Sequence, residues 1–336
     1  MITSEEIDAA VDALQRGELV GMPTETVYGL AADARNPVAL AKIFATKGRP
    51  VDHPVIVHLR DASQMDAWAK DVPPAARVLA DQFWPGPLTL ILRRLSKVSD
   101  LITGSQETVG LRVPAHPVAH ELLTRFGGGL AAPSANRFGR ISPTTAAHVR
   151  AEFGDAVRVV LDGGPSRVGL ESTIVDLSSA NPRVLRPGSI THRQIEDWIG
   201  PLGELENHAI PRVSGALAAH YAPAKRLILV DADAMDATHA GLDRDVLWLG
   251  LQALPLGTQG IALGSEPNTY AFGLYAALRE LDSGTGGTIA VIAPPNGEAW
   301  TAIHDRLRRA ASGSGSGPLS TSTRHPLDPE PRSGDG

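Results

Sequence analysis

Lys47, Gly48, Arg49 and Pro50 form a basic tetrad whose residue types suit the binding of a phosphate or carboxylate group. Arginine offers a planar fork of donors and lysine a point charge, and this pair matches oxyanions well. Gly48 permits a sharp backbone turn, and Pro50 fixes the direction of the chain that leaves it. The same spacing is also typical of a solvated helix end, where cations meet the helix dipole. The tetrad alone leaves both interpretations open.

Ser134 and Asn136 follow a segment of small residues at 129–132 that reads as a strand. Such a strand lets a ligand approach the backbone closely, and the loop after it supplies donors and acceptors for a nucleotide. A serine or asparagine turn that caps a helix explains the same residues. Glu171-Ser172 and Arg186 also lie at strand ends, where ligands gather in α/β folds.

Arg112 lies in an apolar strand, between Leu111 and Val113. A buried arginine needs an anionic partner, which is a carboxylate either of the protein or of a ligand. His58 ends another buried strand, where a lone histidine is more often structural than functional. His53 and His58 are five residues apart and have no third plausible ligand, so the sequence predicts no metal site.

Familiar nucleotide-binding and catalytic motifs are absent from the sequence. It has no P-loop, no G-x-G-x-x-G after a strand and no G-x-S-x-G elbow. The glycine-rich segment at 284–287 precedes a strand and is predicted to be a turn. The chain has no cysteine, which excludes disulfides, thiolate zinc sites and thiol catalysis. A bound nucleotide would need other groups to hold its phosphates.

Length and composition are those of an ordinary protein with about two domains. The chain has 336 residues, of which 43% are hydrophobic and 20% charged. It contains neither an apolar run of the roughly 20 residues that a membrane helix needs nor a secretory signal, so a cytoplasmic location without membrane contact is expected. The net charge of -6 disfavours a protein that coats nucleic acid, although local cations can hold a small anion.

Apolar periodicity predicts the elements that position these residues. Helices are predicted from Ser4 to about Gly17 and over 36–44, 118–126 and 144–153. Predicted strands cover 19–22, 55–57, 88–92, 110–113, 129–132, 158–161, 172–176 and 184–186. This alternation predicts one α/β domain over residues 1–200.

The rest of the chain divides into three predicted parts. Residues 201–225 are rich in proline and glycine and are expected to be a linker. A smaller α/β domain is predicted over 226–311, with strands at 227–230, 246–249 and 288–292 and helices at 270–281 and 298–310. Residues 312–336 consist of glycine, serine, proline and charged residues, which predicts a disordered tail.

Nine segments occur in the order found in the YrdC-like L-threonylcarbamoyladenylate synthases, and the chain resembles that family over about residues 5–200. The linker segment 220–223, His-Tyr-Ala-Pro, followed by a small α/β unit, resembles the longer, two-domain branch. The nine segments are Pro23-Thr24-Glu25-Thr26-Val27-Tyr28-Gly29-Leu30, Lys47-Gly48-Arg49-Pro50, Pro54-Val55-Ile56-Val57-His58, Trp84-Pro85-Gly86-Pro87-Leu88-Thr89, Gly110-Leu111-Arg112-Val113-Pro114, Pro133-Ser134-Ala135-Asn136, Ser142-Pro143-Thr144, Glu171-Ser172-Thr173-Ile174 and Leu185-Arg186-Pro187-Gly188.

The resemblance implies a fold and a reaction. The fold is a twisted mixed sheet with a large, positively charged concave cavity, followed by a smaller Rossmann-like α/β domain. The reaction converts L-threonine, bicarbonate and ATP into threonylcarbamoyl-AMP and pyrophosphate, with Mg²⁺ as the expected metal ion. The expected partners are downstream tRNA threonylcarbamoyl transferase proteins, which modify the adenosine next to the anticodon. A direct contact with tRNA is left open.

The resemblance also implies site residues, with Lys47 and Arg49 facing the phosphates and acting in catalysis. The remaining residues implied for ATP are His53, Thr108, Ser134, Asn136, Ser142, Arg186 and Tyr221. The residues implied for threonine are Thr26, His58, Arg112, Ala132 and Ser172. Arg112 would pair with the carboxylate of threonine, and Tyr221 would lie over the cavity mouth as part of a lid.

The linker departs from the family pattern. Family linkers commonly carry Ser-Pro-Gly and an arginine just before His-Tyr-Ala-Pro, whereas this chain has Val213-Ser214-Gly215 and Ala219-His220. We therefore expect a weaker lid, or one that relies on Lys225 or Arg226. His53 replaces a common asparagine and is expected to keep a polar role near the nucleotide.

Two alternatives share parts of this pattern. A carbamoyl-adenylate transferase of the hydrogenase-maturation type has the same fold, but those chains carry zinc-binding cysteines, which this chain lacks. A non-catalytic module that binds double-stranded RNA or tRNA would also use a basic cavity. Its RNA affinity would fall steeply with added salt and would not depend on threonine.

Overall fold

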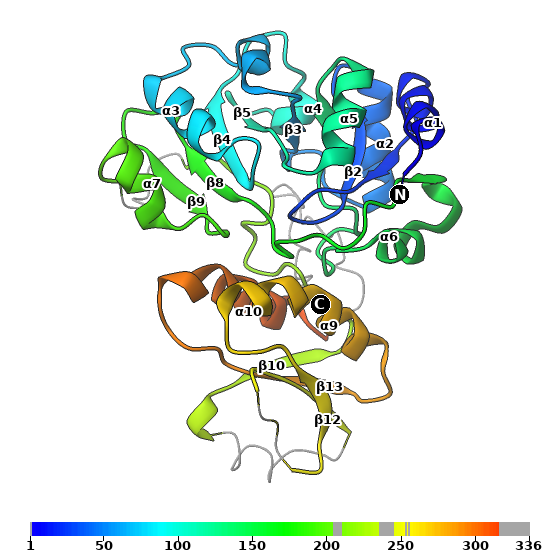
Figure 1. Cartoon of the computed structure of the whole chain (residues 1–336), viewed down its shortest axis with the longest axis vertical. Helices are drawn as coiled ribbons and strands as arrows, with labels where there is room; N and C mark the ends of the chain where they lie inside the picture. The colour runs from blue at the N-terminus through cyan, green and yellow to red at the C-terminus, as the bar shows by residue number, and fades with distance from the viewer. Residues whose placement is uncertain (1, 204–209, 235–244, 253, 255, 316–336) are drawn as a thin grey trace, which may run out of the picture.

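The computed structural model describes residues 2–203, 210–234, 245–252, 254 and 256–315 and forms two sheets (Figure 1). A nine-stranded mixed sheet comes first along the chain, and a four-stranded parallel sheet follows. The α/β fold class predicted from the sequence is confirmed. We propose to divide the chain into a large domain (1–200), a linker (201–225) and a small domain that starts at residue 226.

The nine strands of the large domain bring distant segments together. They are β1 (Val20–Met22), β2 (Gly29–Asp33), β3 (Ile56–His58), β4 (Leu88–Arg93), β5 (Thr108–Arg112), β6 (Leu130–Ala131), β7 (Val159–Val160), β8 (Thr173–Asp176) and β9 (Arg183–Arg186). Their order in the sheet is β7-β1-β2-β6-β3-β5-β4-β8-β9. The parallel register of β3 and β5 places His58 opposite Arg112.

The helices of the large domain are α1 (Ser4–Gln15), α2 (Pro37–Lys47), α3 (Pro74–Phe83), α4 (Asp100–Thr103), α5 (Pro117–Phe126), α6 (Ala146–Phe153) and α7 (His192–Ile199). The sequence predictions included α1, α2, α5 and α6 but placed no element at α3, α4, α7 or β2. Thr3 caps α1: Thr3 and Glu6 form a capping box, in which each side chain accepts from the backbone N–H of the other residue.

Local sequence fixes where α2 ends and the basic tetrad begins. The side chain of Asn36 caps the first turn by accepting from the N–H groups of Val38 and Ala39. Gly48 ends the helix in the left-handed region with φ 62°, and the N–H of Arg49 donates to the carbonyl of Phe44 at 3.0 Å. The tetrad is therefore the C-terminal end of a helix.

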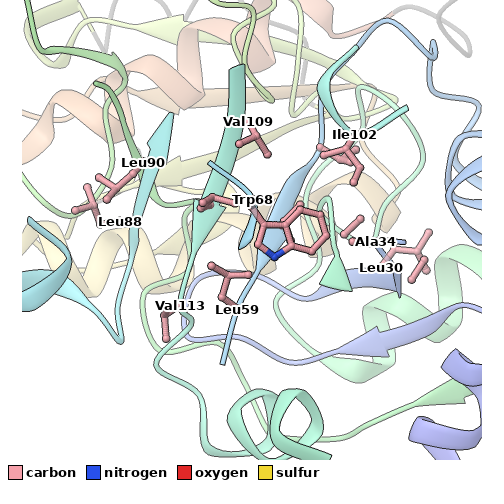
Figure 2. Packing of buried hydrophobic residues seen from close by; sticks show 14 of the residues in the cluster. Leu30, Ala34, Leu59, Trp68, Leu88, Leu90, Ile102, Val109 and Val113 are labelled. Carbon is pink, nitrogen blue, oxygen red and sulfur yellow. The ribbon is translucent and has the colours of Figure 1, made fainter. Parts of the chain in front are cut away.

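Trp68 lies within the main apolar cluster of the large domain, among residues such as Leu59 and Val109 (Figure 2). Gly129 passes directly against this indole, because a Cβ atom there would come within 2.5 Å of the ring. Packing around Trp68 thus explains the glycine that opens the segment of small residues at 129–132.

The small domain contains strands β10 (Arg226–Val230), β11 (Val246–Gly250), β12 (Gln259–Ala262) and β13 (Thr288–Ile292) and helices α9 (Pro267–Ser283) and α10 (Thr301–Gly313). The parallel sheet has the order β10-β13-β11-β12. The sequence predictions missed β12, whose residues are mostly exposed and lack an apolar run. The helix α10 extends to Gly313, beyond the predicted start of the tail, and residues 316–336 lie outside the described chain.

Helices α9 and α10 lie between the small sheet and the large domain (Figure 1). Arg279 of α9 donates to the carbonyl of Ile141 and to the Glu152 carboxylate at 3.1 Å. The linker has no helix or strand in its described residues, 201–203 and 210–225. Among the helices that the structure describes, none has the length and apolarity to cross a membrane.

Candidate active site

A cavity of about 50 Å³ lies at the ends of β3, β5 and β9 and is closed on one side by the linker. The linker contributes Ser214, Gly215, His220 and Tyr221 to its wall. Among the residues implied by the resemblance, those that line this cavity are Thr26, Arg49, His58, Arg112, Ala132, Ser134, Ser172, Arg186 and Tyr221. The fold thus brings together residues from both predicted subsites.

Lys47 is buried behind the cavity wall and does not line the cavity. Its ammonium donates to the carbonyl of Ser134 at 2.6 Å and to that of Asn136, so it ties the end of α2 to the 134–136 loop. Burial, with the nearby Arg49 charge, holds the pKa of Lys47 well below its usual value. The interpretation of the basic tetrad as a solvated helix end is wrong, because Lys47 is only 3% and Arg49 only 7% exposed.

Asn136 and Ser142 also lie behind the wall. The Asn136 amide donates to the carbonyls of Arg137 and Arg140, and its Oδ1 atom is buried without a hydrogen-bond partner in the described structure. The hydroxyl of Ser142 donates to Glu171 at 2.5 Å. The helix-capping interpretation of Ser134 and Asn136 is wrong, because Thr145 caps α6.

Thr108 and His53 lie outside the cavity. Thr108 borders a separate small hollow next to linker residue Val213. The half-buried ring of His53 meets the ring of Phe138 edge-on, with 5.2 Å between centroids, and burial lowers the pKa of His53. The guanidinium of Arg49 lies over the same phenyl ring at 5.7 Å. His53 therefore does not line the cavity, and its ring contacts Phe138, over which the cavity residue Arg49 lies.

Arg49 and Arg186 are the two cations that face both the cavity and the linker. Arg49 donates to the hydroxyl of Ser214 at 3.1 Å, and Arg186 donates to the carbonyl of the same residue at 2.8 Å. Burial lowers the pKa of Arg49 to about 10 and also lowers that of Arg186. Neither these arginines nor Lys47 forms an ion pair within the described residues.

Arg112 has a protein carboxylate as its ionic partner, a question that the sequence left open. It donates to Glu25 at 2.5 Å, to the Thr26 hydroxyl at 2.9 Å and to the Gly86 carbonyl at 3.1 Å. A guanidinium has five N–H groups, so about two remain for a ligand. The neighbouring His58 has no hydrogen bond at Nδ1 in the described structure, and burial, helped by Arg112, lowers its pKa to about 3.

Tyr221 of the linker is buried and has an unusual backbone conformation. Its backbone adopts a left-handed φ of 60°, which is uncommon for a bulky residue. Burial raises its pKa to about 12, and its hydroxyl has no hydrogen-bond partner in the described structure. Gly215 makes room for that hydroxyl, because a Cβ atom there would come within 2.0 Å of it.

Neither Lys225 nor Arg226, the residues on which a lid was expected to rely, lines the cavity. The ammonium of Lys225 donates to carbonyls of the small domain, including that of Leu281 at 2.8 Å, and Arg226 is exposed at the start of β10. Two other arginines hold the linker in place: Arg212, within the linker, donates to the carbonyl of Gly104, and Arg309 of α10 donates to the carbonyl of Ala216. Arg309 follows the linker by many residues, so sequence reasoning had no local signal for its role.

Sequence reasoning noted Glu171 only as a polar residue at a strand end, and it gave no role to Glu25 or Arg306. The two carboxylates stood inside the recognised segments, next to polar residues at strand ends, and this was a usable signal. Glu171 lines the cavity and accepts hydrogen bonds from Ser142, Tyr275 and Arg306. Burial alone would raise its pKa, but the charges of Arg306 and Arg186 and its hydrogen bonds lower the pKa to about 2.

The fold and the cavity define an α/β protein whose candidate site is lined by three buried arginines, Arg49, Arg112 and Arg186. A family model described as "Telomere recombination", covering Sua5, YciO and YrdC proteins, matches residues 12–188. A second model, described as "Threonylcarbamoyl-AMP synthase, C-terminal domain", matches residues 190–312. The chain belongs to this family, in its two-domain form.

Relatives of known name cover nearly the whole chain. The threonylcarbamoyl-AMP synthase of Bacillus subtilis is 37% identical over 92% of this chain and 93% of its own length. That of Pyrococcus abyssi is 35% identical, with 91% and 94% covered. The crystal structure of P. abyssi Sua5 complexed with L-threonine superposes with a TM-score of 0.86 at 34% identity, over 93% of this chain and 96% of that one.

Proposed function

We propose that this chain is an L-threonylcarbamoyladenylate synthase, which forms threonylcarbamoyl-AMP and pyrophosphate from L-threonine, bicarbonate and ATP. The observation that carries this proposal is the pair of buried arginines that face the cavity, Arg49 and Arg186, which have no carboxylate partner among the described residues. Burying a cation without an anionic partner is costly, so the arrangement favours an anionic ligand. The names of the relatives support threonine and ATP as the substrates.

The threonine subsite is proposed around Arg112. The N–H groups that Arg112 does not use within the protein suit the carboxylate of an amino acid. Thr26 and Ser172 supply hydroxyls, and neutral His58 supplies the unpaired Nδ1 atom as an acceptor for the amine or hydroxyl of threonine. The small side chain of Ala132 lets threonine approach the backbone at this part of the cavity wall closely.

The nucleotide subsite is proposed next to it, between Arg49, Ser134 and Arg186. Lys47 shapes this subsite by holding the 134–136 loop, and it reaches a phosphate only if that loop shifts. Pockets that hold drug-sized ligands measure about 300–1,000 Å³, far more than the present cavity. Substrate binding therefore requires the linker to move away, which releases Ser214 from Arg49 and Arg186.

The chemistry fits a site without a protein nucleophile. The amine of threonine and bicarbonate give a carbamate and water, and a carbamate oxygen then attacks the α-phosphorus of ATP while pyrophosphate leaves. Positioning and neutralisation of negative charge supply most of the catalysis in such a transfer. Arg49 and Arg186 are placed to neutralise phosphate charge, and Arg112 to fix the amino acid.

A magnesium ion is proposed to arrive with the nucleotide. No group of three or more histidine or acidic side chains that could hold a metal exists among the described residues. Magnesium is commonly held by substrate phosphates and water, with few protein ligands. Transfer of the product to tRNA threonylcarbamoyl transferase proteins in the cytoplasm, and any contact with tRNA, are part of the same proposal.

The decisive experiment incubates the full chain with ATP, bicarbonate and L-threonine and measures pyrophosphate and the adenylate product. We expect pyrophosphate release that depends on threonine. Omitting threonine, or replacing it with L-valine, whose methyl group stands in for the hydroxyl, is the matched control. Release at the same rate without threonine would refute the synthase, and RNA binding that is unaffected by threonine would then favour the RNA-binding module.

A further inference from the structure

Helix α10 turns two guanidinium groups toward the large domain. Arg306 and Arg309 are three residues apart and so share one face of the helix. Asp305 joins them, accepting from Arg306 at 2.8 Å and from Arg309 at 2.9 Å. Arg309 then donates to the carbonyls of Ala216 and Leu217 in the linker. One face of α10 thus holds both arginines in fixed positions.

Arg306 reaches the wall of the cavity. Its side chain is fully buried, and its Nε atom donates to Oε2 of Glu171 at 2.9 Å. The hydroxyl of Tyr275, on α9, donates to the same oxygen at 2.9 Å. The other oxygen of Glu171 accepts from Ser142 at 2.5 Å. The small domain therefore holds one oxygen of this carboxylate, and the other oxygen orients a residue implied for ATP.

The same two small-domain residues support the linker tyrosine. The guanidinium of Arg306 lies 5.2 Å from the centre of the Tyr221 ring, and the ring of Tyr275 stacks on it at 5.7 Å. A cation over an aromatic face is attractive, especially when both groups are desolvated. These contacts help to hold Tyr221 in its left-handed conformation.

We infer that Arg306 is a positioning residue for the nucleotide subsite: through Glu171 it fixes the Ser142 hydroxyl, and it supports Tyr221 without touching a substrate itself. The inference rests on the proposed function for the identity of the ligand. It assigns a role to the small domain, which supplies a rigid anchor behind the ATP side of the cavity. The threonine side, around Arg112, has no contact with α10 among the described residues.

The test compares two variants, Arg306→Lys and the control Arg308→Lys. Arg308 is an exposed arginine on the same helix. Lysine keeps the charge but loses the planar fork that bonds Glu171, Asp305 and Pro187 together. We expect Arg306→Lys to raise the KM for ATP about tenfold and to leave the KM for threonine within about twofold. Arg308→Lys should change neither constant. Equal rises in both constants, or no rise, would overturn the inference.

A double-mutant cycle tests the route through Glu171. In a Glu171→Gln background, Arg306→Lys should have a smaller effect on ATP affinity than in the wild type, because its partner charge is already gone. The same factor in both backgrounds contradicts that route. ATP affinity is measured by calorimetry without threonine, so this result stands even if the wild-type chain fails the pyrophosphate assay.

A milder variant covers the case in which Arg306→Lys does not fold. Tyr275→Phe removes only the hydroxyl that donates to Glu171 and keeps the ring on Tyr221. We expect about a threefold loss of ATP affinity with an unchanged melting temperature within about 2 °C. An unchanged ATP affinity in this variant would overturn the inference.

Discussion

The two domains treat buried charge in opposite ways. The large domain buries several charged side chains, and Arg49, Arg112, Glu171 and Arg186 among them line one cavity. In the described part of the small domain, only Asp305 and Arg306 are buried and charged, and Arg306 reaches into the large domain. In its described part the small domain is therefore mainly apolar, and helices α9 and α10 carry its polar contacts with Glu171.

Their sheets show the same contrast. Every residue of β11 in the small domain is buried, and its side chains enter apolar clusters on both faces of the parallel sheet. The mixed sheet of the large domain instead ends its strands in polar residues such as His58, Arg112 and Arg186. These residues lower the stability that their strands contribute, and they form the walls of the site.

Truncation at about residue 205 tests this contrast most severely. The shortened chain loses the linker wall of the cavity, together with Arg306 and Tyr275 behind Glu171. We expect turnover to fall by at least about 100-fold, because misplacement of reacting groups by roughly 1 Å costs that much. Pyrophosphate release measures turnover, and circular dichroism checks that the large domain stays folded. A folded fragment with full activity would show that the linker and small domain are dispensable.

Arg112→Ala tests the other side of the cavity. It removes the group proposed to bind the carboxylate of threonine and leaves buried Glu25 without its cation. We expect kcat/KM for threonine to fall about 100-fold, equivalent to about 2.7 kcal/mol, and the KM for ATP to change much less.

The matched control for Arg112→Ala is Arg93→Ala, on the neighbouring strand β4, where the arginine is exposed and pairs with Asp71. That exposed pair is worth little, so the control should retain wild-type kinetics. An ATP requirement that rises more than the threonine requirement in Arg112→Ala would contradict the assignment of Arg112.

The sequence was sufficient for most of the apolar elements, and the resemblance named nine of the eighteen residues that line the cavity. Strands such as β4 and β13 are continuous apolar runs, so periodicity identified them. Helix α3 was not predicted, although Pro74 stands in its first turn, where proline is well tolerated.

Pairing across the fold could not be predicted. Nothing near Arg112 in sequence indicates that Glu25 is its partner, and nothing near Glu171 indicates Arg306. The position of Lys47 behind the wall depends on the carbonyls of Ser134 and Asn136, which the fold brings in from the far side of the cavity. Residue types predicted the kind of site, whereas the three-dimensional contacts decide which residues face a ligand and which hold those residues in place.

The stability of the protein in acid offers a third, smaller test of the contrast between the two domains. His58 in the large domain and His220 in the linker are buried, and burial lowers the pKa of each to about 3. The unfolded chain takes up protons below about pH 6.5, so the stability from these neutral histidines is complete above that pH and is lost as the pH falls toward 3. We expect about 2 kcal/mol of lost stability per histidine between pH 7 and pH 5.

Urea unfolding at several pH values measures this loss. His58→Gln should flatten the pH profile, whereas His120→Gln, at an exposed position on α5, should leave it as in the wild type. A profile in His58→Gln with the wild-type slope would mean that the histidine is not kept neutral by burial.

The contact between Glu171 and Arg306 joins residues 135 positions apart and so constrains the order of events during chain synthesis. At roughly 5–20 residues per second, about 7–27 s separate the addition of the two residues. Through that interval the large domain can complete its sheet, while the carboxylate of Glu171 still lacks its cation. The ATP side of the proposed site is thus finished only when α10 docks, and a nascent chain has no complete nucleotide site before Arg306 has been added.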